Sequence, residues 1–171
     1  MLDRLVEGGL ITAVQAERAA VHAQRLGERI EEAVLDLFQL SEADLLKFLA
    51  GSFRTKYVTT ERLATARVEP ATVRMVPRKL AERMLVFPIL FEPKTRDLSI
   101  ATPDVTNISL LREVQMVSGA RSVTVLLARP AAVRALVRKY FDNDLRAFGI
   151  IGAVGQPIEL ELDPSPAGGT E

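Results

Sequence analysis

The sequence predicts an α+β protein in which a duplicated unit of four helices precedes a small α-β-β-α-β-α domain with a three-stranded sheet. Apolar residues recur at helical spacing throughout residues 1–53. Between residues 54 and 141, short runs rich in valine and isoleucine alternate with helical segments, which is typical of a sheet covered by helices. Beyond residue 141 this periodicity ends. We therefore expect a helical repeat subdomain over 1–53, an α+β subdomain over 54–141 and a flexible linker or tail over 142–171.

The helical unit carries an internal repeat. Residues 9–15 (GLITAVQ) are echoed by residues 38–44 (FQLSEAD). Each copy places a hydroxyl residue, Thr12 or Ser41, just before an amphipathic helix and an amide or carboxylate three positions later. This spacing predicts a helix N-terminus whose first turn is capped by the hydroxyl oxygen. A repeat of this length indicates a duplicated supersecondary unit, and such units commonly serve as binding scaffolds.

Glycines mark the breaks between the predicted helices. A short first helix should end at the glycine pair of residues 8–9, since glycine readily adopts the left-handed conformation that ends helices. Helices over 13–24, 30–37 and 45–49 follow, with Gly27 and Gly51 near two of their ends.

The second domain begins with residues 57–60, as a short strand or an extended linker. Proline opens three of its helices, at Pro70, Pro77 and Pro130, because a proline in the first turn loses no hydrogen bond. Strands are predicted over 85–91, 98–101 and 122–127, and the first two form a hairpin around residues 92–97. Between the second and third strands, Asn107 can cap a helix that Gly119 ends.

Composition excludes several classes of function. Basic and acidic residues number 22 each, so no overall field attracts nucleic acid. The chain has no cysteine, and its single histidine, His22, leaves a histidine-based metal site without a second member, so we expect no metal site. No glycine is followed directly by lysine, so the phosphate-binding loop of an ATPase is absent and we expect no enzyme activity. With no signal sequence and no long apolar run, we expect a cytoplasmic protein that does not insert into a membrane.

The order of elements, with three short motifs, resembles the N-terminal domain of bacterial type II secretion and type IV pilus assembly ATPases (the GspE-like N-terminal domain). The motifs are residues 9–12 (GLIT), 76–81 (VPRKLA) and 100–104 (IATPD). The resemblance implies a non-catalytic docking or regulatory domain. Its expected partner is an inner-membrane secretion or pilus platform component, or a covalently linked downstream domain. Such a partner would hold the protein at the periphery of the inner membrane.

The helical repeat is also similar, in degenerate form, to the MshE-type repeat, which implies an alternative function as a cyclic di-GMP-binding regulatory domain. No other cofactor is implied. The first copy keeps residues 9–11, whereas the second has Arg29 where the repeat begins with arginine; a literal Arg-Leu-Gly triplet at residues 25–27 lies about one helical turn too early. The residues that the resemblance assigns to the nucleotide are Leu5, Gly9, Leu10, Ile11, Arg29, Leu40, Leu45 and Leu49.

A basic cluster surrounds the helix that Pro77 opens. It consists of Arg74, Arg78, Lys79 and Arg83. These charges are consistent with a solvent-exposed helix face. The alternative, which makes a more specific prediction, is a surface that binds an acidic partner.

Overall fold

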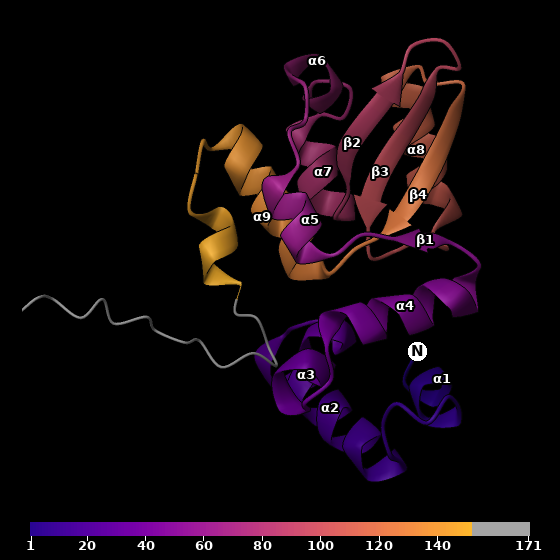
Figure 1. The fold of residues 1–171 in the computed structure, drawn as a ribbon, viewed down its shortest axis with the longest axis vertical. Helices are drawn as coiled ribbons and strands as arrows, with labels where there is room; N and C mark the ends of the chain where they lie inside the picture. The colour runs from indigo at the N-terminus through magenta and orange to yellow at the C-terminus, as the bar shows by residue number, and fades with distance from the viewer. Residues whose placement is uncertain (152–171) are drawn as a thin grey trace, which may run out of the picture.

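The fold is two-part, with a helical unit packed below one end of a sheet (Figure 1). The computed structural model describes residues 1–151. The helical unit comprises α1 (Leu2–Glu7), α2 (Ala13–Leu26), α3 (Ile30–Leu37) and α4 (Glu42–Phe53). The second part comprises β1 (Lys56–Tyr57), α5 (Thr60–Thr65), α6 (Pro70–Val73), α7 (Arg78–Met84), β2 (Phe87–Glu92), β3 (Asp97–Thr102), α8 (Ile108–Ser118), β4 (Ser122–Leu127), α9 (Pro130–Phe141) and a 3₁₀ helix (Ala147–Ile150). The predicted α+β class is confirmed.

The predicted number of strands is wrong, because the sheet has four strands in the order β1-β4-β3-β2. The additional strand, β1, pairs in parallel with the end of β4, so that Lys56 lies opposite Leu126 and Tyr57 opposite Leu127. β2 and β3 form the predicted antiparallel hairpin, with a register shift between Pro88 and Leu90. The short helix α5, which the sequence did not indicate, follows β1 and is capped by Thr59.

Both predicted helix caps of the repeat are present. Thr12 Oγ1 accepts a hydrogen bond from the Gln15 backbone N–H at 3.2 Å, and Gln15 Oε1 accepts one from the Thr12 N–H at 2.8 Å. In the second copy, Ser41 Oγ accepts from the Asp44 N–H at 3.0 Å. Gly9 has a φ of 73°, which allows the chain to turn sharply between α1 and α2.

Two hydrophobic cores meet at the lower end of the sheet. The first lies among α1 to α4 and includes Leu35 and Leu49, together with Leu127 from the end of β4. The second lies between the sheet and its helices, around Phe87 and Ile100. Because Leu127 belongs to the core of the helical unit, that unit packs directly on the sheet. The expected boundary between subdomains at residues 53 and 54 stays a prediction.

The predicted tail begins too early. Residues 142–151 continue past α9 into the 3₁₀ helix, where Ala147 is fully buried. Its carbonyl oxygen accepts a hydrogen bond from Arg138 Nη2 at 3.0 Å. The remainder of the predicted tail, residues 152–171, lies outside the described residues. Within residues 1–151, no helix is long and apolar enough to cross a membrane.

Candidate functional site

A buried ion pair joins the two parts of the molecule. Glu32, in the first turn of α3, and Arg129, the residue before α9, have side chains that are 10% and 7% exposed. Glu32 Oε2 accepts hydrogen bonds from Arg129 Nε at 2.9 Å and from Arg129 Nη2 at 2.7 Å. Glu32 Oε1 accepts from the Ala131 backbone N–H at 2.9 Å, so both carboxylate oxygens are satisfied. The helical unit is therefore held against the N-terminus of α9 by charge as well as by apolar packing.

Arg29 forms a second ionic contact across the same junction. Its guanidinium makes two hydrogen bonds to Asp104, at 2.7 and 3.3 Å, and one to Glu31 at 3.1 Å. Burial lowers the pKa of Arg29, but the hydrogen bonds and negative charges of Asp104 and Glu31 outweigh burial and raise it above its usual value. Two carboxylates thus occupy the guanidinium that the resemblance assigns to the nucleotide.

Six of the other seven residues assigned to the nucleotide lie in or against the core of the helical unit, and the seventh, Gly9, lies on the surface. Four of them are buried in the core of the helical unit: Leu5, Ile11, Leu45 and Leu49. Leu10 and Leu40 are half-buried, and Gly9 is exposed. Gly9 precedes α2 and Arg29 follows it, which separates them by about 21 Å along the axis of this helix.

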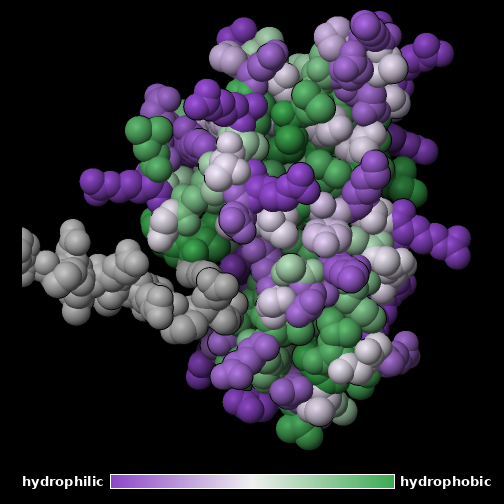
Figure 2. All heavy atoms as spheres, in the orientation of Figure 1, coloured by the Kyte–Doolittle hydropathy of each residue, from purple (hydrophilic) through white to green (hydrophobic). Residues whose placement is uncertain are grey.

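A surface hollow of about 520 Å³ lies between α1 and α2, close to the Gly9 turn. Small side chains on α2 open it, and its lining comprises Leu2, Asp3, Val6, Glu7, Ala13, Ala16, Glu17 and Ala20. In Figure 2, hydrophobic residues gather over this lower part of the molecule. The hollow's charged lining residues are all carboxylates, so it favours an apolar or cationic ligand over a phosphate.

The predicted basic cluster lies on the surface around α6 and α7, and all four of its side chains are exposed. Arg78 pairs with Glu82 at 2.8 Å and with Asp142 at 2.6 Å. Hydrogen bonds to Glu82 and then to Asp142 raise the pKa of Arg78 above its usual value. Arg83 pairs with Glu113.

Arg74 and Lys79 differ from the other two members of the cluster. Neither forms an ion pair with another residue in the part of the chain that the structure describes. These two charges are therefore available to a partner. Figure 2 shows hydrophilic side chains projecting around α6, at the upper left of Figure 1.

Residues 53–147, more than half of the chain, match the MshEN domain. The chain belongs to the MshEN domain family. This MshEN domain is 28% identical over 158 residues to the type IV pilus assembly ATPase PilB of Myxococcus xanthus (strain DK1622), a match that covers 92% of the chain and 27% of PilB. The chain therefore spans about a quarter of the length of that relative.

Two solved structures resemble the MshEN domain. The structure of MshE with cdg (cyclic di-GMP) superimposes with a TM-score of 0.60 at 24% identity, over 81% of this chain and 96% of that one. The N-terminal domain of XpsE superimposes with a TM-score of 0.48 at 16% identity, over 81% and 93% of the two chains. The predicted similarity to the N-terminal domains of secretion and pilus ATPases is confirmed, and the match is to these domains rather than to a catalytic ATPase domain.

The sequence did not indicate the partners of the charged residues at the junction. Asp104 ends the motif of residues 100–104, yet nothing in that motif connects it to Arg29. Glu32 stands beside Glu31 and looks like part of a solvated helix face, whereas the structure buries both. Only the position of these residues near helix N-termini could have drawn attention to them.

Proposed function

We propose that this MshEN domain is a non-catalytic docking module of a type IV pilus or type II secretion system, and that it binds an acidic surface of the inner-membrane platform protein. Family membership supports the class of function. The observation that carries the proposal is the exposed pair Arg74 and Lys79, which no acidic residue within residues 1–151 neutralises. Such charges accelerate association with an acidic surface and make binding depend on salt.

Docking of this kind would place the protein in the cytoplasm at the periphery of the inner membrane, held there by its partner. A covalently linked downstream domain is the other partner consistent with the resemblance to PilB, since the chain spans 27% of that protein. In both cases the domain positions another component, and no reaction is assigned to its own residues.

Charge reversal tests the docking surface. The double substitution Arg74→Glu with Lys79→Glu is expected to weaken binding to the cytoplasmic domain of the platform protein by about tenfold or more, because attraction becomes repulsion. The measurement is a titration by surface plasmon resonance at two salt concentrations.

The matched control is Arg112→Glu with Arg121→Glu, which makes the same charge change at two exposed positions in and just after α8. We expect its affinity to stay within about twofold of the unmodified chain. Equal losses in both double variants would show that net charge, rather than this surface, controls binding.

Cyclic di-GMP binding is a second candidate function, which the likeness to the structure of MshE with cdg favours at the level of the fold. Calorimetry with cyclic di-GMP tests it on two separate single variants. Arg29→Ala removes the arginine that the 29-residue repeat assigns to the nucleotide, and Arg25→Ala removes the arginine of the alternative register. A receptor that uses the repeat register should lose binding in Arg29→Ala and keep it in Arg25→Ala. The absence of heat up to millimolar nucleotide would rule this function out.

A further inference from the structure

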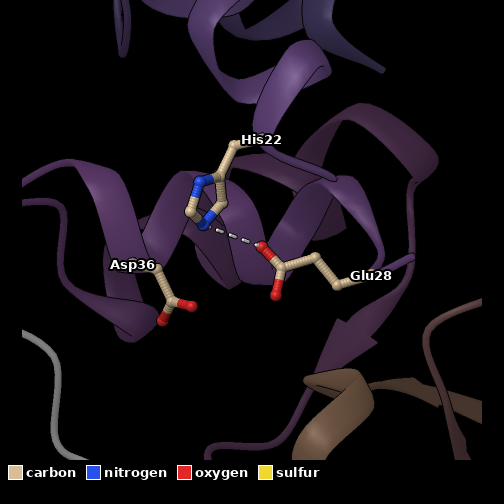
Figure 3. Close-up of side chains that lie close together, drawn as sticks. All are labelled: His22, Glu28 and Asp36. Carbon is tan, nitrogen blue, oxygen red and sulfur yellow. Dashed lines mark ion pairs between the residues drawn. The ribbon is translucent and has the colours of Figure 1, made fainter. Parts of the chain in front are cut away.

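We infer that His22, Glu28 and Asp36 form a binding site for a divalent transition-metal ion such as Zn²⁺. One donor atom from each residue can be chosen so that all three lie within 4.8 Å of one another. Figure 3 shows the imidazole of His22 directed between the carboxylates of Glu28 and Asp36. Counting histidines in the sequence predicted no metal site, but the fold supplies two carboxylates to the only imidazole.

The spacing of the first two ligands fits a metal ion. His22 Nε2 and Glu28 Oε1 form an ion pair at 3.3 Å, a separation that two ligands of one metal ion can also have. Two ligand atoms that each bind zinc at its usual distance in a tetrahedral arrangement are about 3.4 Å apart. Asp36 is exposed, so its side chain can rotate to bring a carboxylate oxygen to the same metal ion.

Glu28 supplies an independent reason to expect a cation. Its Oε1 atom is buried, yet it accepts no hydrogen bond from any of the described residues, although His22 Nε2 is near. Its contact with His22 Nε2 is an ion pair, and a buried carboxylate oxygen that accepts no hydrogen bond is costly. A metal ion bound to both Oε1 and Nε2 would remove that cost.

The backbone holds two of the ligands in place before a metal arrives. Gly27, with a φ of 65°, ends α2, and the N–H groups of Gly27 and Glu28 both donate to the carbonyl of Ala23. This turn brings Glu28 back toward His22, one turn earlier on α2. Asp36 comes from the last turn of α3, which packs beside α2. A bound ion would therefore fasten the C-terminal end of α2 to α3.

The ligand set indicates the class of metal. An imidazole nitrogen with two carboxylates suits zinc and its neighbours, whereas calcium and magnesium prefer oxygen ligands alone. Three protein ligands leave a fourth position for water. Arg18 and Arg25 line the adjacent hollow with His22, and their positive charges oppose that of the ion. The guanidinium of Arg18 lies over the ring of Phe38, with its carbon 6.0 Å from the ring centre.

The test uses the untagged chain, because His22 is its only histidine. Titration calorimetry with ZnCl₂ should show one ion bound per chain, and thermal unfolding should shift upward as zinc is added. In an NMR spectrum of the histidine ring nitrogens, the single imidazole should shift on binding. Affinity should fall as the pH is lowered, since protons compete for the same ligands.

Variants separate this site from adventitious binding. His22→Gln and Asp36→Asn should each weaken zinc binding by at least about tenfold. Glu61→Gln, at an exposed carboxylate on α5 that is not part of this hollow, should change it by less than about twofold. Circular dichroism checks that each variant is folded. Failure of the unmodified chain to bind zinc below millimolar concentration, or binding that survives His22→Gln, would overturn the proposal.

Discussion

Substitution of Glu32 by alanine is expected to lower the free energy of unfolding by about 3–5 kcal/mol. The change removes a buried carboxylate that accepts two hydrogen bonds from Arg129 and one from the Ala131 N–H. For a chain of this length the loss corresponds to a decrease of roughly 10 °C in the melting temperature. Urea unfolding followed by circular dichroism measures the free energy directly.

The control for Glu32→Ala is Glu113→Ala, which breaks the exposed pair with Arg83. The two side chains of that pair are 32% and 60% exposed, so the expected loss is about 1 kcal/mol or less. If Glu113→Ala costs as much as Glu32→Ala, the buried pair does not hold the two parts of the molecule together in the way described above.

The second large effect is expected in the core between the sheet and its helices. Phe87 is fully buried, and its ring lies 5.3 Å from that of Tyr140 and 6.1 Å from that of Phe141, measured between centres. Phe87→Ala removes these ring contacts and leaves a cavity, which should cost about 3–5 kcal/mol in the free energy of unfolding. Thermal unfolding by calorimetry gives the measurement.

Leu90→Ala on the same strand is the matched control, because Leu90 is 62% exposed. Its expected cost is within about 0.5 kcal/mol. Similar losses from both substitutions would mean that β2 does not present Phe87 to the core and Leu90 to solvent.

Elements whose signals are local could be predicted from the sequence. The caps at Thr12 and Ser41 depend on residues three positions away, and both hydrogen bonds form as expected. The helices opened by Pro70 and Pro130 also follow from one residue and its immediate neighbours. These caps and helix starts could be predicted because each depends on residues within a few positions in the sequence.

Elements that depend on distant partners could not be predicted. Lys56 and Tyr57 form a strand only because the end of β4 offers them a parallel partner. The 3₁₀ helix around Ala147 is stabilised by packing on α9, which no local pattern indicates. The same holds for charges at the junction, since Arg29 and Asp104 are 75 positions apart in the chain.

The basic cluster likewise has one part that the sequence indicated and one that depends on distant residues. The sequence indicated a basic cluster around the helix that Pro77 opens. The structure adds that, among residues 1–151, Arg78 and Arg83 have acidic partners whereas Arg74 and Lys79 form no ion pair. Only coordinates could show those pairings, because Asp142 and Glu113 come from α9's end and from α8. The proposed docking surface therefore rests on two of the four basic residues of the cluster.

Hydrogen–deuterium exchange of the chain with and without the platform protein's cytoplasmic domain tests the docking proposal most directly. Because bound surfaces exchange more slowly, the proposal predicts added protection in residues 70–84, which span α6 and α7. The protection should disappear in the variant that carries Arg74→Glu with Lys79→Glu. Protection confined to α8, or to the hollow between α1 and α2, would contradict docking through the basic surface.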